Sequence, residues 1–337
     1  MTTPIHDPGP AVAGEQAVTS EGDAAEPIHA PHGGRIRVGT ASWTDPTLLK
    51  PGVFYPKGAN TPEERLRYYA SQFALVEIDA TYYALPSRHM AELWMQRTPP
   101  TFTFDCKANA LMTGQPMEVK RLPPEIRGEL PAALAEKPRI YGADLPPELY
   151  DAVWASFIDA MQPLHSSGKL GVVLLQYPRW FTPRADNRDA ILDARERLGD
   201  MGCAVELRNA LWFTPRNAER TLQFFSDHDI PYVMVDEPQG FANSVPPLTA
   251  VTSSRLAVVR FHGRRADTWN KRNVSVAERF RYFYSTHELE EWVPRIEEAA
   301  SETREVHVIM NNCYANYGTT NASQMAMLLR AAEPIAS

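Results

Sequence analysis

The feature that most constrains the fold is a regular alternation, from Arg35 onward, of short β-type runs with amphipathic helical stretches. This alternation is typical of repeated βα units, which build a parallel sheet. The candidate strands are residues 36–42, 75–81, 101–107, 171–176, 204–208, 232–236, 257–262 and 306–311. Eight strands are the number that closes a TIM-type (β/α) barrel, so we predict an α/β fold of that type.

Helical patterns fill most of the gaps between these strands. The candidate helices are residues 62–73, 87–96, 147–161, 187–198, 215–227, 286–300 and 321–332. The first opens with Thr61-Pro62-Glu63-Glu64, which combines an N-cap residue, a proline and first-turn acids. Residues 237–255, between the sixth and seventh strands, contain two adjacent prolines and little helical periodicity. We therefore expect an irregular crossover at that point.

Composition divides the chain into a tail and one barrel domain. Residues 1–34 are rich in Ala, Gly, Pro and acids and lack the basic start and apolar core of a signal peptide, so we predict a disordered tail. Residues 35–337 form the predicted single domain. Within it, the proline-rich residues 115–146 are either a decorative insertion or a lid over the barrel mouth. No apolar run approaches the roughly 20 residues of a membrane helix, so no membrane partner is expected.

Charge and cysteine content narrow the function classes. The 337 residues carry a formal net charge of -7, which argues against general attraction to duplex nucleic acid, although a local basic patch can override that average. The three cysteines, Cys106, Cys203 and Cys313, include no Cys-x-x-Cys pair. They suggest neither a disulfide framework nor a thiolate zinc site, and a reducing, cytoplasmic location is the expectation.

Polar side chains end every predicted strand, although the strands themselves are mainly apolar. Because side chains alternate between the faces of a strand, Glu206 and Arg208 share one face. In a βα barrel the working residues lie at the C-terminal strand ends, which meet at one mouth. The candidates there are Thr40, Ser42, Glu77, Asp79, Thr81, Lys107, Gln176, Glu206, Arg208, Asp236, Arg260, His262, Asn311 and Asn312. We expect them to converge on one pocket.

Two interpretations of these groups stay open. In the functional one, Glu206 or Glu77 acts as general acid or base and His262 relays a proton. Lys107 belongs to this catalytic group and, with Arg208, holds an anionic group. The remaining substrate-binding or anion-binding candidates are Arg260, Arg264, Gln176, Asn311, Asn312, Trp43 and Tyr82. In the alternative interpretation, the charges form a buried, compensated network that fills the barrel without catalysis.

Metal and phosphate binding are further hypotheses. Mg²⁺ or Mn²⁺ prefers oxygen ligands, and Asp79 and Asp236 are the metal candidates. The segment 262–265, His-Gly-Arg-Arg, follows the seventh strand, where many barrels bind phosphate, and arginine forks match phosphate oxygens. A solvated charged loop is the alternative. The glycine motifs of dinucleotide sites and P-loops are absent, so neither NAD nor ATP bound by a P-loop is expected.

An ordered set of motifs runs along the chain. They are Val38-Gly39-Thr40-Ala41-Ser42-Trp43, Phe54-Tyr55-Pro56, Val76-Glu77-Ile78-Asp79-Ala80-Thr81-Tyr82-Tyr83, Leu85-Pro86-Ser87, Leu175-Gln176-Tyr177-Pro178, Val205-Glu206-Leu207-Arg208, Arg260-Phe261-His262-Gly263-Arg264 and Asn311-Asn312. Together they resemble the YecE-like family, domain of unknown function 72, which implies a TIM-type barrel and no established activity. Asp79 stands where that family favours asparagine, and Asn209 where histidine is common, so a mechanism that needs this histidine is not expected.

These observations lead to one main functional hypothesis. We expect an enzyme of hydrolase or isomerase type that uses acid–base or metal-assisted chemistry on a polar, anionic small molecule, phosphorylated or sugar-like. One alternative is a nucleic-acid-binding or repair-type protein, whose binding would weaken steeply as salt rises. Another is a protein that binds a metabolite without turning it over.

Overall fold

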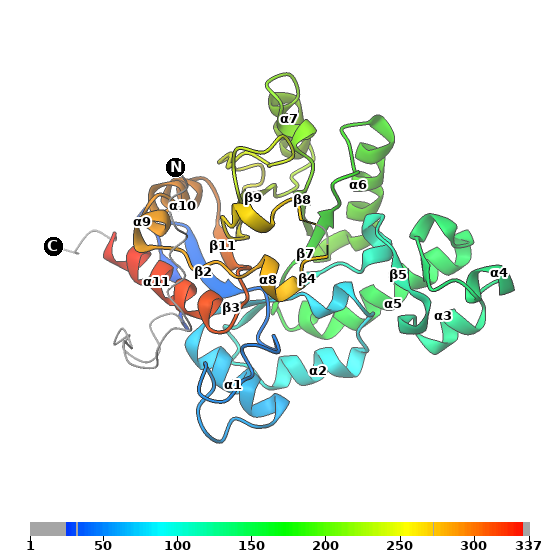
Figure 1. Cartoon of the computed structure of the whole chain (residues 1–337), viewed down its shortest axis with the longest axis horizontal. Helices are drawn as coiled ribbons and strands as arrows, with labels where there is room; N and C mark the ends of the chain where they lie inside the picture. The colour runs from blue at the N-terminus through cyan, green and yellow to red at the C-terminus, as the bar shows by residue number, and fades with distance from the viewer. Residues whose placement is uncertain (1–24, 32, 272, 333–337) are drawn as a thin grey trace.

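The computed structural model describes residues 25–31, 33–271 and 273–332. Its central sheet has eight parallel strands in the order β8-β7-β4-β3-β2-β11-β10-β9. Their bounds are β2 (Arg35–Thr40), β3 (Leu75–Ile78), β4 (Thr103–Lys107), β7 (Leu170–Tyr177), β8 (Cys203–Leu207), β9 (Val233–Asp236), β10 (Ala257–Phe261) and β11 (Glu305–Met310). Val205 of β8 bridges Tyr232, directly before β9, and brings the two ends of the sheet together. The predicted TIM-type barrel is confirmed (Figure 1).

Helices lie outside the strands, as Figure 1 shows. They are α1 (Pro62–Gln72), α2 (Arg88–Gln96), α5 (Pro147–Ser166), α6 (Ala185–Leu198), α7 (Ala218–Asp227), α9 (Thr286–Glu290), α10 (Val293–Glu302) and α11 (Tyr317–Ala331). Thr61 caps α1 in the predicted way, in a capping box with Glu64. The predicted helix over 286–300 is instead two helices, because Pro294 starts α10. Residues 237–255 contain no helix, so the irregular crossover is confirmed.

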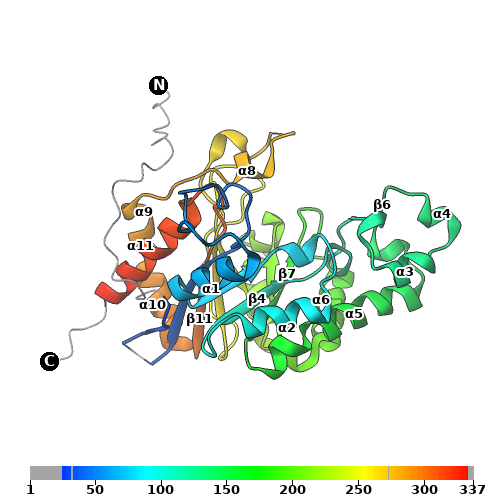
Figure 2. The ribbon, with the colours of Figure 1, turned by 90° about the horizontal axis from the view of Figure 1, so that it is seen from below.

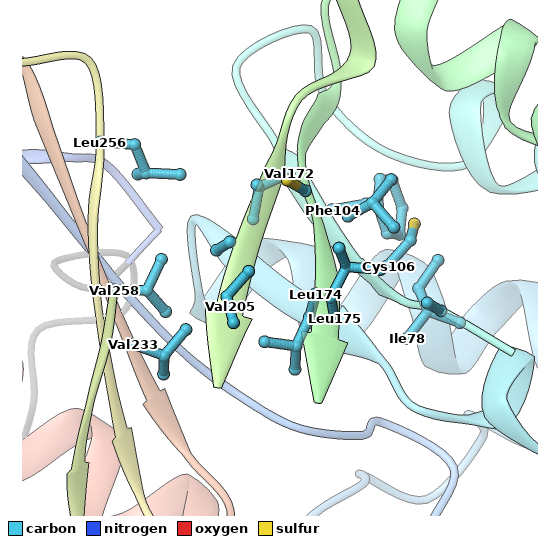
Figure 3. Close-up of a cluster of buried hydrophobic side chains, with 14 of the residues drawn as sticks. Ile78, Phe104, Cys106, Val172, Leu174, Leu175, Val205, Val233, Leu256 and Val258 are labelled. Atoms are coloured by element: carbon cyan, nitrogen blue, oxygen red, sulfur yellow. The ribbon is translucent and has the colours of Figure 1, made fainter. Parts of the chain in front are cut away.

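Most of the buried side chains on the barrel strands are apolar. Figure 3 shows Val205, Val233 and Val258 among the buried side chains of β8, β9 and β10, and none is more than 2% exposed. Side-chain alternation puts Glu206 on the face of β8 opposite Val205. Glu206 and Val205 therefore point to opposite sides of the barrel wall.

The proline-rich segment is folded. It contains β5 (Met117–Glu118), α3 (Pro124–Gly128), α4 (Ala132–Ala135) and β6 (Arg139–Ile140). The two strands pair antiparallel with each other. Both views place α3 and α4 beyond α5, at the side of the barrel (Figures 1 and 2). No residue of the segment lines the cavity described below, so its position differs from that of a lid over this cavity.

The N-terminal boundary differs from the expected one. Residues 1–24 of the predicted tail lie outside the described residues. After them, β1 (Ile28–His29) pairs antiparallel with β2, and Ile28 is 2% exposed. Ordered structure thus begins before Arg35, because Ile28, an apolar residue within a polar stretch, is buried where β1 pairs with β2. In the part of the chain that the structure describes, no helix is long and apolar enough to cross a membrane.

Candidate functional site

A cavity of about 170 Å³ opens at the C-terminal ends of the strands, and we call it the mouth cavity. Side chains from six strands or their ends line it: Asp79, Lys107, Gln176, Arg208, Arg260, His262 and Asn311. The remaining lining comes mainly from the segment after β10, which includes Trp269 and α8 (Val276–Arg279). With Ser42, which also lines the cavity, eight of the predicted site residues are therefore brought together at one water-accessible place.

A buried ion network forms beneath this cavity. The Arg260 guanidinium, 1% exposed, donates to both oxygens of Glu77, with Nε to Oε2 at 2.9 Å and Nη2 to Oε1 at 2.7 Å. It also donates through Nη1 to Oε2 of Glu206. One guanidinium therefore bridges two carboxylates that come from β3 and β8. Such bidentate pairs fix geometry as well as charge.

Glu206 is saturated with donors. Its Oε1 accepts from Gln176 at 2.9 Å and from Arg208 at 3.1 Å, and lies 3.0 Å from Nε2 of His262. Burial alone would raise its pKa, but Arg260 and His262 hold the pKa well below the usual range. The carboxylate is ionised, fully hydrogen-bonded and 0% exposed. A group so placed has no free lone pair directed at a ligand.

Glu77 behaves differently, although it shares the same guanidinium. Burial raises its pKa to about 7, against the opposing effects of Arg260 and Lys107. Neither Glu77 nor Glu206 lines the mouth cavity. The structure therefore brings the two predicted catalytic carboxylates together but places them under the floor of the cavity. Their catalytic role stays a prediction, and their contacts are those of a compensated buried network.

His262 has both ring nitrogens engaged. Nδ1 lies 2.8 Å from the Asn311 amide nitrogen, and Nε2 lies 3.0 Å from Glu206. An amide N–H can only donate, so Nδ1 accepts and the proton sits on Nε2, where it is donated to the carboxylate. Burial lowers the pKa of His262 to about 3. The ring is therefore neutral near pH 7, in the tautomer that supports Glu206.

Lys107 and Asp79 face the mouth cavity instead. Asp79 directly follows β3 and Lys107 ends β4, and the residues that precede them, Ile78 and Cys106, are paired in the sheet. The Lys107 ammonium lies 4.6 Å from the centre of the Tyr82 ring. Within the described residues neither group has an ion pair; the Lys107 ammonium has no hydrogen bond, and the Asp79 carboxyl has one with its own backbone N–H. Burial lowers the pKa of Lys107 and raises that of Asp79.

Further cations around the cavity went unrecognised in the sequence. Arg179 lies over the Trp269 ring, 4.4 Å from its centre, and Arg208 lies 5.7 Å from the same ring. Arg279, at the end of α8, donates only to backbone carbonyls, at 3.4 Å to Trp269 and 3.2 Å to Lys271. Arg179 comes two residues after the strand β7, beside the Leu-Gln-Tyr-Pro motif, and that position could have identified it as a candidate in the sequence.

Other predicted binding residues lie elsewhere. Arg264 pairs with Asp236 at 2.7 Å and with Glu291 at 2.8 Å, and neither it nor Asp236 lines the mouth cavity. Asn312 is 0% exposed and donates to Tyr282 and Asn321. Trp43 is 7% exposed, with edge contacts to Trp94 and Phe104. Tyr82 does not line the cavity, although its ring underlies Lys107.

The metal candidates do not form a common site. Asp236 accepts from Arg264, from the Tyr284 hydroxyl at 2.7 Å and from the Trp292 indole at 2.7 Å. Asp79 is separate from it, in the mouth cavity. Across the described ranges, no group of three or more His, Cys, Asp or Glu side chains is arranged to hold a metal ion. A metal bound through Asp79 and Asp236 together does not fit this arrangement.

A larger cavity, of about 530 Å³, lies at the opposite, N-terminal end of the strands. Its buried charged side chains have partners: Arg37 pairs with Glu305, which also pairs with Arg35 at 3.1 Å, and His307 pairs with Asp105 at 2.9 Å. The physical difference from the mouth cavity is that these buried charges are already compensated. The mouth cavity, with unpaired charges, is therefore the better candidate site.

Comparison with known proteins agrees with the barrel and with the motifs. A family model described as "Protein of unknown function DUF72" matches residues 37–336. UPF0759 protein YunF of Bacillus subtilis is 33% identical over 297 residues, which are 87% of this chain and 94% of that protein.

Two solved structures are also similar. A DUF72 family protein from Enterococcus faecalis has a TM-score of 0.70 at 29% identity, covering 87% of this chain and 95% of its own. Another, from Thermotoga maritima, has a TM-score of 0.69 at 27% identity, covering 87% and 98%. The resemblance seen in the motifs is confirmed, and the chain, a TIM-type barrel, belongs to the DUF72 family.

Proposed function

We propose that this chain binds an anionic small molecule, phosphorylated or sugar-like, in the mouth cavity and transforms it by acid–base chemistry. The charge of the lining carries the proposal. Six cationic side chains line the cavity against two carboxylates, Asp45 and Asp79. The cations are Lys107, Arg179, Arg208, Arg260, Arg265 and Arg279. The whole chain carries a net negative charge, so this local excess of cations departs from the average of the chain.

Half of these cations are already compensated. Arg208 pairs with Glu206 and with Glu237 at 2.9 Å, Arg260 pairs as described above, and Arg265 pairs with Asp267 at 2.8 Å and with Glu278 at 2.9 Å. Lys107, Arg179 and Arg279 have no carboxylate within 4.0 Å among the described residues. These three supply the free positive charge, and stacking on Trp269 keeps Arg179 ordered before a ligand arrives.

The groups able to move protons are those in contact with the cavity. Burial raises the pKa of Asp79 and lowers that of Lys107, and both shifts are in the direction that suits a group that takes and gives protons. Gln176 and Asn311 line the same space and suit the hydroxyls of a polar substrate. In this proposal Glu77 and Glu206 position Arg260 and Arg208 and do not touch the substrate, and His262 supports Glu206 through its Nε2.

Binding of nucleic acid is a second candidate, favoured by one observation. Trp180, 61% exposed, and Leu211, 51% exposed, follow β7 and β8. Asn209 donates to the Arg179 carbonyl and so connects their two loops. An exposed aromatic ring beside a cationic cavity suits the stacking of a base with its phosphate in the cavity. A salt dependence far steeper than that of phosphate alone would distinguish a polyanion from a small ligand.

The test of the main proposal is a titration with inorganic phosphate at constant ionic strength, followed by calorimetry. We expect wild type to bind phosphate and R179Q to bind it about 10–100-fold more weakly, because a hydrogen bond to a charged group contributes about 1.5–3 kcal/mol. The matched control is R184Q, since Arg184 is exposed and pairs with Asp186 at 3.4 Å, outside the cavity. Equal phosphate affinity in wild type and R179Q would contradict the proposal.

A further inference from the structure

Lys107 occupies an unusual position for a lysine. It ends the barrel strand β4, lines the mouth cavity, and has no acceptor for its ammonium among the described residues. The backbone beneath it is fixed, because the Thr81 hydroxyl donates to the Lys107 carbonyl and the Asn109 amide donates to the Thr81 carbonyl at 3.1 Å. The side chain therefore projects from a rigid corner into the space where a ligand would bind.

A second lysine shows what a structural lysine looks like in this chain. The Lys169 ammonium donates to the carbonyls of Met95 and Thr98, each at 2.7 Å, and to the Thr98 hydroxyl at 3.0 Å. It caps the end of α2 and lies outside the mouth cavity. Burial lowers the pKa of both lysines. Only Lys107 combines this shift with a free amine that faces a cavity.

The surroundings of Lys107 make its ammonium easier to deprotonate than that of an exposed lysine. Burial is the main cause of its lowered pKa, and the Arg260 guanidinium is the second. Desolvation and a neighbouring cation are the two means by which a lysine becomes a nucleophile. The carboxylates Glu77, Asp79 and Glu206 act in the opposite direction, yet none lies within ion-pair distance of the ammonium. The nearest cavity-facing one is Asp79, from the neighbouring strand.

We propose that Lys107 forms a Schiff base with the carbonyl carbon of an anionic aldehyde, ketone or keto acid bound in the mouth cavity, with Asp79 as the proton carrier. This inference rests on the proposed function and gives it a substrate class. The free charges of Arg179 and Arg279 would hold the phosphate or carboxylate of that substrate.

The chemical step balances with the groups present. Asp79 takes a proton from the ammonium, and the amine nitrogen attacks the carbonyl carbon while the C=O π pair moves to oxygen. Asp79 then returns the proton to that oxygen, removes one from nitrogen, and delivers it to the hydroxyl, which leaves as water. The sum is one ammonium plus one carbonyl giving one protonated imine plus one water, with no oxidant or reductant.

The test is reductive trapping with sodium borohydride, in the presence of pyruvate or of dihydroxyacetone phosphate, followed by intact mass measurement and peptide mapping. We expect a single adduct at Lys107 in wild type and no adduct at Lys169. K107R should give no adduct, because a guanidinium cannot form the imine. D79N should form the adduct about 100-fold more slowly, within the range for loss of a proton-transfer group. Inorganic phosphate should slow trapping in wild type by competition.

Two results would overturn the inference: no adduct with either probe, or adducts distributed over exposed lysines such as Lys50, Lys57 and Lys120. The phosphate titration, run on the same protein, separates the two proposals. Phosphate binding without an adduct rejects the Schiff base alone, whereas loss of both rejects the anion site as well. Thermal unfolding of K107R and D79N confirms that an absent adduct does not reflect an unfolded barrel.

Discussion

Replacing Arg260 by Met tests whether the buried network under the mouth cavity is a compensated structural unit. The substitution leaves the carboxylates of Glu77 and Glu206, which are 1% and 0% exposed, without their shared guanidinium. Removing one partner of a buried ion pair costs about 3–5 kcal/mol, and here one cation serves two anions. We therefore expect the free energy of unfolding to fall by about 5 kcal/mol at pH 8.

The loss should depend on pH in a defined direction. Burial already raises the pKa of Glu77 to about 7, so its folded form binds a proton more strongly than its unfolded form. A carboxyl of this kind loses stability as pH rises through about 4.5 to 7. In R260M its pKa rises further, and the first added unit increases the loss at pH 8 relative to pH 5.5 by about 1 kcal/mol, whereas further units add little because the carboxyl is then largely protonated at pH 8.

Urea unfolding at pH 5.5 and pH 8 measures both quantities. The matched control is R67M, because Arg67 pairs with Glu63 on the exposed face of α1, with side chains 58% and 45% exposed. That pair should contribute less than about 1 kcal/mol. A loss in R260M as small as that in R67M, or one that is larger at pH 5.5 than at pH 8, would refute the reasoning about this network.

Two further predictions follow from single sites. The His262 ring should show no titration by NMR between pH 8 and pH 4.5, because burial lowers its pKa to about 3. Its contribution to stability is present above pH 6.5 and is lost as pH falls toward 3. An NMR titration midpoint near pH 6.5 would contradict this prediction. G39A should destabilise the barrel by about 3 kcal/mol, since the new Cβ would lie 2.0 Å from the Leu75 carbonyl oxygen. The control G128A, in α3, should be neutral or slightly stabilising, because its Cβ would meet nothing within 4 Å. Equal urea midpoints for the two variants would show that β2 and β3 do not approach this closely.

The barrel was predictable because its signal is local and repeated. Each strand is a short apolar run, and the alternation with helices leaves few topologies open. The convergence of the polar residues was predictable for the same reason, since the parallel strands all end at one mouth of the barrel. Thus the pairing of Glu206 with Arg208, at 3.1 Å on one strand face, follows directly from side-chain alternation.

The sequence could not predict which polar residues at the strand ends line the mouth cavity and which are buried beneath it. Glu206 and Asp79 look equivalent in the sequence, as acids on strands that end at the mouth. In the structure they differ because Arg260, on β10, pairs with Glu206 and Glu77 beneath the mouth cavity, whereas Asp79 lines the cavity itself. Such a choice depends on a partner about 54 residues away, which no local pattern reveals.

Residues outside the strands were the other source of error. Arg264 looked like a phosphate ligand beside Gly263, yet Asp236 and Glu291 already bind it. Arg279 was not recognised as a candidate in the sequence, yet it lies at the end of α8 and lines the cavity. Irregular segments have no period from which side-chain direction can be inferred, so only the folded chain shows which cations are free.

The most direct test of an anion site in the mouth cavity is a crystal structure of wild type, purified without chelator and soaked in phosphate. The account predicts phosphate density between Lys107, Arg179 and Arg279, with Glu77 and Glu206 still bound to Arg260 beneath it. A mouth cavity without phosphate, in a crystal where phosphate occupies the N-terminal cavity or exposed arginines such as Arg184, would contradict it.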